Sequence, residues 1–480
     1  MRIALISEHA SPIAAAGGVD AGGQNIYVDR VARGLAARGH RVDVMTRRED
    51  RSLPTVVPLC AGARVLHVDA GPPEVMPKEE LLPFMPAFAA SAGTLTKREG
   101  GYDVLHANFF MSGRVGLALR RRFGTPLAMT FHALGLVRRQ HQGDADRFPA
   151  ARIDIERELV RGADALVATC PQEQADLVRL YDADATHIIG VPCGVDPRHF
   201  TPGDRLAARA RLGLPAHEFL VLQLGRMVPR KGIDNVVRAL ALLPHDESQP
   251  PARLLVVGGA CREPDEAATP EIGRLRALAE ALGVDARVRF VGRRDQAELR
   301  DWYVAADVFV TTPWYEPFGI TPLEAMACGR PVIGADVGGI RTTVVDGVTG
   351  FLVPPHDPAA LAARLAQLRR DPALAEALGR AGVRRVRARF TWDTVCARLA
   401  RLYAALAGER AVVAAPSQPA HIAPMRGVSI TPITPHVPIT PIAPIAPIAS
   451  RGPIAAHEPI TPIAPVTPVT PTAPVAGAWR

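Results

Sequence analysis

Two carboxylates stand eight positions apart in the segment Glu316-Pro-Phe-Gly-Ile-Thr-Pro-Leu-Glu324. If a helix begins near Phe318, the free N–H groups of its first turn and the positive end of its dipole face any anion above the loop, and a diphosphate suits that position. At about 1.5 Å per residue, Glu324 then lies roughly 8 Å along the axis, beside the anion. Because carboxylates accept hydrogen bonds from sugar hydroxyls, the segment indicates a nucleotide-sugar site. The alternative is a pair of solvated glutamates that flank a helix start.

Two cations occupy a strand-to-helix turn upstream of this segment. The apolar run 219–225 reads as a buried strand that ends in Gly225, and Arg226 and Lys231 follow before a helical pattern begins near Ile233. Taken singly, each cation is more typical of a solvated surface residue. Their shared position at one turn favours a role in binding an anion.

A second apolar strand, 331–336, leads into the pair Gly338 and Gly339. Glycines without side chains let a backbone approach a ligand closely. In open parallel sheets, ligands bind outside the carboxyl ends of the strands, so we expect these turns to share one crevice. Arg226 and Lys231 would neutralise a diphosphate there.

Residues 1 to about 407 resemble the retaining glycosyltransferases of family 4. These enzymes have the GT-B fold, an α/β architecture in which two Rossmann-like, doubly wound domains face one another across a cleft. The resemblance rests on the two glutamates and two cations above, on Asp307 within Ala-Ala-Asp-Val-Phe-Val, and on two further segments. These segments are Glu324-Ala-Met-Ala-Cys-Gly-Arg-Pro-Val-Ile, leading to the glycine pair, and Gly347-Val-Thr-Gly-Phe-Leu-Val.

The resemblance implies a role for each of these side chains. Glu316 would contact the donor sugar, and Glu324 the ribose. Contacts to the diphosphate are implied for Arg226, Lys231 and the backbone N–H groups of Gly319 and Ile320. Backbone groups from Gly292 to Arg294 are expected to recognise the base, and the family's habits favour UDP as the nucleotide.

The N-terminal stretch predicts a βαβ unit, with a buried strand over 1–7, a glycine-rich loop, a helix from about Gln24 and a strand over 41–46. No Lys-Ser or Lys-Thr follows Gly22 and Gly23, and the loop does not fit Gly-x-Gly-x-x-Gly. ATP-type and NAD-type cradles are therefore disfavoured. The loop resembles that of family members related to sucrose-phosphate synthase and the inositol-phosphate-using enzymes, so both glycines are expected at the donor.

Two strands of the first half run into loops with histidines, 101–108 with His106 and 126–133 with His132. The resemblance implies that His132 contacts the donor sugar and helps to hold the charge that develops near the anomeric carbon. A lone histidine after a strand is otherwise typical of a satisfied partner of backbone carbonyls. Only its position at a strand end speaks for His106 as a site residue.

The inositol-phosphate-using subgroup holds its acceptor phosphate with an Asn, Lys, Tyr, Thr and Arg set. Asn25, Lys78 and Arg152 match three of these positions, whereas Phe109 and Ala133 stand where the tyrosine and threonine would be. Two hydroxyl donors are therefore missing from the expected phosphate pocket. We expect an acceptor other than inositol phosphate, within the broad class of glycans, glycolipids and sugar phosphates.

The length of 480 residues and the apolar content of 48% predict two domains with separate cores. Short apolar strands alternate with helical runs in both halves. We expect an acceptor-side domain over 1–195, a nucleotide-sugar domain over 196–386 and a last helix over 387–408 that crosses back to the first domain. Hinge closure between the halves is the expected motion.

The composition changes at about Ala411, and sixteen of the forty-five prolines fall in 411–480, many at three-residue spacing. This spacing aligns prolines on one face of a polyproline II helix, so a third folded domain is disfavoured. The segment reads as a disordered, Pro-rich tail. Docking to an aromatic groove or to a membrane-associated complex is the alternative, with an unknown partner.

Composition disfavours several classes of protein. A net charge of +8 with 5% aromatic residues gives no stacking platform for nucleic acid. The run Arg120–Arg122 reads as a solvated helix end, or else as a basic helix on anionic lipid. The six cysteines lack metal or disulfide spacing, no leader is recognisable and no stretch reaches eighteen apolar residues. We expect a cytoplasmic protein, at most peripheral to the inner face of the membrane.

Asp-x-Asp occurs at Asp144/Asp146 and Asp182/Asp184, which raises the question of a metal-dependent transferase. Both copies read as helix or turn acids outside the donor crevice. Arg226 and Lys231 already supply the charge that a divalent ion would bring. We therefore predict metal independence and no resident cofactor.

The resemblance implies transfer of a glycosyl group from a nucleoside diphosphate with retention at the anomeric carbon. A front-face departure, in which the leaving diphosphate helps to accept the proton of the acceptor, suits a site built from cations and helix ends. Two rivals remain open. One is a GT-B enzyme that hydrolyses or epimerises a nucleotide-sugar, and the other is a non-catalytic module that binds a glycan or a partner.

Overall fold

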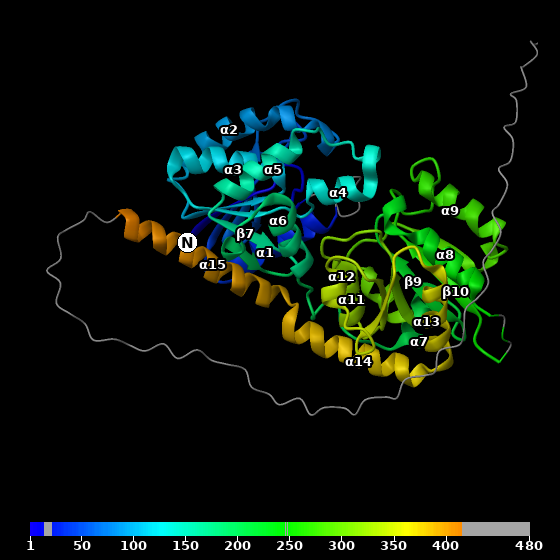
Figure 1. Cartoon of the computed structure of the whole chain (residues 1–480). Helices are drawn as coiled ribbons and strands as arrows, with labels where there is room; N and C mark the ends of the chain where they lie inside the picture. The colour runs from blue at the N-terminus through cyan, green and yellow to red at the C-terminus, as the bar shows by residue number, and fades with distance from the viewer. Residues whose placement is uncertain (14–21, 245, 247, 415–480) are drawn as a thin grey trace, which may run out of the picture. The chain divides into compact units, whose positions relative to one another are not determined.

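A computed structural model describes residues 1–13, 22–244, 246 and 248–414 of the chain (Figure 1). Met1–Pro416 form one compact unit. The predicted Pro-rich tail lies outside the described residues except for 411–414, which belong to the last helix.

The first half builds a sheet whose described strands follow the order β3-β4-β2-β1-β5-β6-β7-β8. All neighbours pair in parallel except β3 and β4. The strands are β1 (Arg2–Ile6), β2 (Arg41–Arg47), β3 (Val56–Cys60), β4 (Ala63–Val68), β5 (Val104–Asn108), β6 (Leu127–Thr130), β7 (Ala165–Ala168) and β8 (Ile188–Gly190). The central strands are short, mainly apolar runs that are buried except at Arg2, as expected for a parallel sheet covered on both faces.

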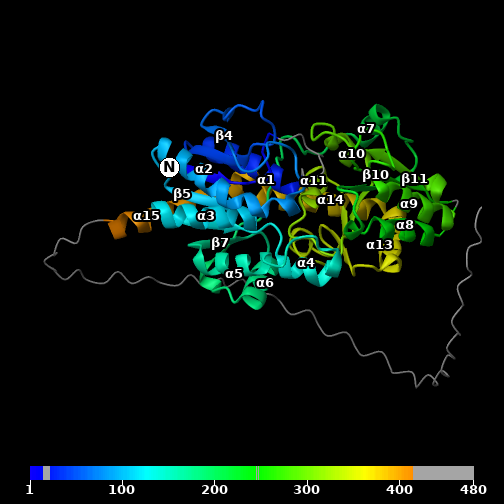
Figure 2. The same cartoon turned by 90° about the horizontal axis from the view of Figure 1, so that it is seen from above.

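Helices connect these strands and cover the sheet (Figures 1 and 2). They are α1 (Gly23–Ala36), α2 (Met85–Arg98), α3 (Phe110–Phe123), α4 (Gly135–Gln142), α5 (Arg152–Gly162) and α6 (Pro171–Tyr181). Short 3-10 turns occur at Lys78–Glu80, Leu82–Phe84, Gly143–Ala145 and Ala185–His187.

The second half repeats this plan with a parallel sheet in the order β11-β10-β9-β12-β13-β14. Its strands are β9 (Phe219–Leu224), β10 (Ala252–Val257), β11 (Val288–Gly292), β12 (Val308–Thr311), β13 (Val332–Ala335) and β14 (Gly350–Val353). Its helices are α7 (Arg205–Leu212), α8 (Ile233–Leu242), α9 (Pro270–Ala281), α10 (Leu299–Ala305), α11 (Ile320–Ala327), α12 (Ile340–Thr343), α13 (Pro358–Arg370) and α14 (Pro372–Arg389). The turns Pro229–Lys231 and Asp285–Arg287 are 3-10 helical.

Strand order reverses in both sheets beside the first strand of each half. β1 lies between β2 and β5, and β9 lies between β10 and β12. Ligands of doubly wound folds bind outside the carboxyl ends of the strands at such reversals. The two parallel-sheet α/β halves confirm the predicted fold class.

The last helix, α15 (Trp392–Ala414), packs against α1 of the first half, whereas α14 packs against α11 of the second (Figures 1 and 2). Gly34 of α1 allows α15 to approach closely, because a Cβ at this position would lie 2.3 Å from Cys396 Sγ. The Tyr403 hydroxyl lies 2.5 Å from Nδ1 of His106. The last described helix therefore lies on the half in which the chain begins.

The structure adds two details near the carboxylate segment, and the first differs from the sequence-based expectation. α11 begins at Ile320, later than the expected start near Phe318, because Gly319 has a φ of 86°, outside the helical region. The pair Gly338 and Gly339 approaches protein backbone closely, and Gly338 also lines the cavity beside Glu316. A Cβ on Gly338 would lie 2.0 Å from the Glu316 carbonyl oxygen, and one on Gly339 would lie 2.3 Å from Phe318 Cα. These glycines let their loop pack on the backbone of the carboxylate segment.

Candidate functional site

Lys231 and Glu316 form an ion pair beyond the carboxyl ends of two adjacent strands. Lys231 Nζ donates to Glu316 Oε2, and the two side chains are 17% and 14% exposed. Lys231 follows β9 and Glu316 follows β12, and these strands are neighbours in the sheet. The sheet therefore brings together two residues that are 85 positions apart.

Burial and the charge of neighbouring groups shift the pKa of each member of this pair. Burial raises the pKa of the Glu316 carboxyl, but Lys231 and Arg230 outweigh it, so the pKa lies below its ordinary value. Burial lowers the pKa of Lys231, and Glu316 offsets part of that shift. The two groups therefore sustain one another's charge away from bulk water.

The first turns of α1 and α11 face one another from the two halves. A Cβ on Gly23, the first residue of α1, would lie 3.6 Å from Cδ1 of Ile320, the first residue of α11. The start of α1 is fixed by Asn25, whose Oδ1 accepts from the Gly22 N–H at 3.0 Å. Helix starts carry unpaired N–H groups and the positive dipole end. Two of them beside Lys231 create a place suited to a diphosphate.

Glu324 lies on α11 and is only 2% exposed. Its Oε2 accepts from the Tyr303 hydroxyl at 2.8 Å, and its Oε1 accepts from Gln296 Nε2 at 3.0 Å. Burial raises the pKa of this carboxyl, although the two hydrogen bonds oppose the shift. Tyr303 and Gln296 fix the carboxylate in position, and neither is marked by any sequence motif.

Arg226 and Arg294 line a cavity of about 290 Å³ outside β9, β10 and β11. Arg226 is exposed and directly follows Gly225, the first residue after β9. Arg294 Nη1 donates to the Arg262 carbonyl oxygen at 2.6 Å. The cavity lies at the carboxyl ends of the strands, where a nucleoside would extend from a diphosphate.

His132 lies in the loop after β6, beside residues from two other elements. Its Nε2 donates to Asn108 Oδ1 at 3.0 Å, the direction that the Asn108 amide group permits, and its ring meets the Tyr27 ring edge-on at 4.9 Å. Burial lowers the pKa of His132 to about 3, and the nearby His106 and His9 add to the shift. Its φ of 59° is left-handed, a strained conformation that is often found at functional sites.

His106 has a different environment. It is fully buried, with Nδ1 facing Tyr403 and Nε2 lying 2.8 Å from Thr130 Oγ1. Both ring nitrogens are thus used inside the protein. This histidine ties α15 to the first sheet.

The expected acceptor side contains an enclosed arginine. Arg152 is 1% exposed, and its guanidinium carbon lies 4.6–5.0 Å from the ring centres of Phe109, Phe110 and Phe148. Its Nε donates to Glu156 at 2.7 Å. Within the described residues, its Nη1 has no hydrogen-bond partner. Arg152 is therefore neutralised by a carboxylate and covered by apolar rings.

The other predicted acceptor residues are engaged by protein groups. Asn25 Nδ2 donates to the Ser11 carbonyl oxygen at 3.0 Å, and Lys78 pairs with Glu79 at 3.1 Å. Phe109 has a φ of 85°, so a second strained residue stands at a strand end near His132.

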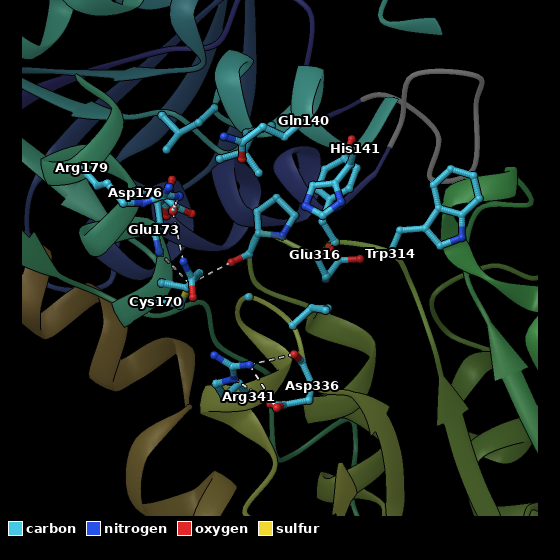
Figure 3. A pocket seen from close by; sticks show the side chains of 18 residues that line it. Gln140, His141, Cys170, Glu173, Asp176, Arg179, Trp314, Glu316, Asp336 and Arg341 are labelled. Atoms are coloured by element: carbon cyan, nitrogen blue, oxygen red, sulfur yellow. Dashed lines mark hydrogen bonds and ion pairs between the residues drawn. The ribbon is translucent and has the colours of Figure 1, made fainter. Parts of the chain in front are cut away.

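A cavity of about 250 Å³ lies between the halves, next to Glu316 (Figure 3). Figure 3 shows Trp314 and Glu316 on one side, and Glu173 and Asp176 of α6 on the other. Glu173 Oε2 accepts from the Thr169 N–H at 2.7 Å, and burial raises the pKa of its carboxyl. The lining of the cavity combines charged side chains such as Asp176 and Arg341 with apolar ones such as Leu134 and Val137.

Features outside the cleft have structural roles. Asp146 pairs with Arg138, and Asp184 caps a 3-10 turn through the Thr186 N–H. Arg120 and Arg121 pair with acidic neighbours. Among the described residues, no group of three potential metal ligands occurs and no helix is long and apolar enough to cross a membrane.

The chain matches two family models, "Glycosyltransferase Family 4" over residues 21–199 and "Glycosyl transferases group 1" over 204–385. It is 42% identical over 405 residues to D-inositol 3-phosphate glycosyltransferase 1 of Catenulispora acidiphila, an overlap that covers 84% of this chain and 95% of that protein. The chain belongs to glycosyltransferase family 4. The related protein of Streptomyces scabiei is 40% identical to this glycosyltransferase over 413 residues, covering 84% and 91% of the two chains.

Solved structures agree with this membership. Sucrose-phosphate synthase from Thermosynechococcus elongatus is 38% identical to this glycosyltransferase, with a TM-score of 0.78 and coverage of 85% and 99% of the two chains. Anabaena HepE in complex with UDP-glucose is 22% identical, with a TM-score of 0.65 and coverage of 84% and 100%, and it shares the fold.

Proposed function

We propose that this glycosyltransferase moves a sugar from a nucleoside diphosphate, with UDP as the expected nucleotide, to a hydroxyl acceptor and retains the anomeric configuration. The observation that carries the proposal is the Lys231–Glu316 pair next to the facing helix starts at Gly23 and Ile320. A diphosphate in this position would meet two positive helix ends and an ammonium group. Its sugar would lie against Glu316.

Donor binding would exchange partners within the ion pair. Lys231 would turn from Glu316 to a phosphate oxygen, with Arg226 and the N–H groups of Gly319 and Ile320 completing the cradle. Glu316 would then accept hydrogen bonds from hydroxyls of the sugar. Glu324 would hold the ribose, and backbone groups near Arg294 would meet the base. No metal and no resident cofactor has a role in this scheme.

His132 would act as a neutral hydrogen-bonding partner of the sugar. With a pKa near 3 its ring is uncharged at physiological pH. Because Nε2 donates to Asn108, the lone pair of Nδ1 can accept from a sugar hydroxyl. The tautomer is thus set by Asn108, on the strand next to β6.

Transfer would proceed on the front face of the sugar. The bond from the anomeric carbon to the phosphate oxygen breaks, the acceptor oxygen bonds to the same face, and the acceptor proton passes to the leaving phosphate. Cations and helix starts stabilise the charge that develops on the diphosphate. Glu316, whose Cγ would lie 3.4 Å from a Cβ on Gly319 at the start of α11, is engaged by Lys231, which favours this route over a covalent intermediate on the enzyme.

We also propose an acceptor other than inositol phosphate. Phe109 and Ala133 supply no hydroxyl, and Arg152 is already paired with Glu156 under three phenylalanine rings. A phosphate dianion would find little uncompensated charge there. Transfer to inositol phosphate at a rate above that for unphosphorylated acceptors would refute this part of the proposal.

Hydrolysis or epimerisation of a nucleotide-sugar and non-catalytic binding are the alternatives. Family membership and the intact Lys231–Glu316 pair speak against both, and analysis of the products separates them from transfer.

Thermal stabilisation of the full chain by UDP, GDP, ADP and NAD tests the proposal. A ligand at a hundredfold excess over its Kd adds about 2.7 kcal/mol to the stability of the native state. We expect stabilisation by UDP and none by NAD, followed by sugar transfer from the UDP-sugar in a screen of acceptors. Failure of every nucleoside diphosphate to stabilise the chain would overturn the proposal.

A further inference from the structure

Tyr315 is held by side chains from both halves of the molecule. Its ring stacks on the His141 ring, with centres 4.9 Å apart and planes inclined by 20°. The Arg230 guanidinium lies 5.2 Å from the Tyr315 ring centre, and Gln142 Nε2 donates to the Tyr315 hydroxyl. We call Tyr315, His141, Gln142 and Arg230 the Tyr315 cluster. His141 and Gln142 are the last residues of α4, so the first half reaches a loop of the second.

The cluster adjoins the ion pair of the proposed donor site. Arg230 directly precedes Lys231, and Tyr315 directly precedes Glu316. Each residue of the ion pair therefore follows a residue of the Tyr315 cluster. The Trp314 N–H also donates to the Arg230 carbonyl oxygen at 2.9 Å. The two loops are therefore joined by a backbone hydrogen bond, by a ring contact and by the ion pair, in consecutive positions.

The placement of Arg230 depends on packing. Within the part of the chain that the structure describes, its Nη1 is buried and has no hydrogen-bond partner. Its charge nevertheless lowers the pKa of Glu316. The Tyr315 ring supports this guanidinium by a cation–π contact, so a movement of Tyr315 would displace a charge that acts on Glu316.

The same loop touches the first half at a second point. Cys170, the N-cap of α6, donates its thiol to the Pro317 carbonyl oxygen at 3.2 Å. Glu316 therefore stands between two residues, Tyr315 and Pro317, that contact α4 and α6. A carboxylate held on both sides in this way loses little rotational freedom when a sugar binds, which is the advantage of a preorganised site.

We propose that Tyr315 is a positioning residue and that the end of α4, through Gln142 and His141, sets Glu316 for the donor sugar. The inference rests on the proposed function in one respect, since it assigns the sugar to Glu316. Binding of the diphosphate alone does not require the cluster, because that group is held by Lys231 and the helix starts. Binding of the sugar and its transfer do.

The test uses Tyr315→Phe and Gln142→Leu, which remove the two partners of one hydrogen bond, and the double variant. Gln140→Leu is the matched control, because it makes the same change at an exposed position of α4. Hydrogen exchange of the ligand-free full chain is the first measurement. The reporters are the Trp314 amide and the Gly339 amide, which donates to the Glu316 carbonyl oxygen at 3.0 Å.

We expect exchange at these amides to rise by about 3- to 10-fold in both single variants, the effect of losing one hydrogen bond. The double variant should be no faster than either single variant, since both remove one shared interaction. Gln140→Leu should match the wild type. Unchanged exchange in Tyr315→Phe, or additive increases in the double variant, would overturn the proposal.

The second measurement compares UDP with UDP-glucose by calorimetry. In the wild type the sugar should tighten binding, and in Tyr315→Phe this gain should fall by about 3- to 10-fold while the Kd of UDP stays the same. A purely structural defect would weaken both ligands together, and that result would contradict positioning. If neither ligand bound the wild type, the proposed function would fail, whereas the exchange result would still decide the role of the cluster.

Discussion

Glu316→Gln keeps the shape of the side chain and removes its charge, so it separates binding of the sugar from binding of the diphosphate. A hydrogen bond to a charged group contributes about 1.5–3 kcal/mol, and about 1.4 kcal/mol corresponds to a factor of ten. We therefore expect kcat/KM for transfer to fall by roughly 10- to 100-fold. UDP should bind as tightly as before or more tightly, because Lys231 is no longer engaged by a carboxylate.

The same variant should lose stability, because Lys231 is left without its counter-ion. Breaking an enclosed pair costs about 3–5 kcal/mol, and the cost should be lower for this pair because its side chains remain 17% and 14% exposed. Glu218→Gln is the matched control. Glu218 is 10% exposed, pairs with Arg253 and precedes β9, so it lies at the opposite end of the strands from the site.

Three measurements decide the outcome: calorimetry for the Kd of UDP, release of UDP in the presence of donor and acceptor for kcat/KM, and thermal unfolding for stability. Glu218→Gln should lose stability without losing transfer. A parallel fall in UDP affinity and transfer in Glu316→Gln, or transfer within threefold of the wild type, would refute the assignment of Glu316 to the sugar.

Four further predictions follow from the structure. Lys231→Ala should abolish stabilisation by UDP, since it removes the cation beside the helix starts, and unchanged affinity would contradict that role. EDTA should leave transfer intact, and a loss of activity restored by Mg²⁺ or Mn²⁺ would show a metal requirement. Burial lowers the pKa of His106 from 6.5 to about 3, so the unfolded chain takes up a proton that the folded chain excludes. The stability present above pH 6.5 is therefore lost as the pH falls toward 3, by about 2 kcal/mol at pH 5. Urea unfolding at a series of pH values should show that the free energy of unfolding depends less on pH in His106→Gln than in the wild type. Deleting residues 415–480 should leave kcat/KM unchanged, because all proposed site residues precede them, and a slower enzyme would assign the tail a catalytic role.

Much of the local structure could be predicted from short stretches of sequence. The helix after Gly22-Gly23 and the helix near Ile233 begin within one residue of the expected positions, because glycines and apolar periodicity mark both starts. The prediction is less accurate for the start of α11. A single φ of 86° at Gly319 delays it, and the sequence does not show which glycine adopts a positive φ.

The contacts of the site residues depend on the tertiary structure. No local pattern links Gln296 and Tyr303 to Glu324, because these contacts form only when α10 and its preceding loop pack beside α11. The glycines 338 and 339 pack on the backbone of Glu316 and Phe318, a contact that no local pattern predicts. Such contacts are missed because neighbours in space come from strand order, which a single sequence does not reveal.

The sequence by itself determined the alternation of strands and helices, the two-sheet fold class and the residue types able to hold a nucleotide-sugar, since these depend on periodicity and side-chain chemistry within a few residues. Only the tertiary structure decided that Lys231 neutralises Glu316, that Arg152 is enclosed by three aromatic rings and that the end of α4 holds Tyr315. Each of these contacts joins positions far apart in the chain, or elements whose packing is fixed by the whole core. Burial and charge pairing at such positions, rather than residue type, set what each group can do.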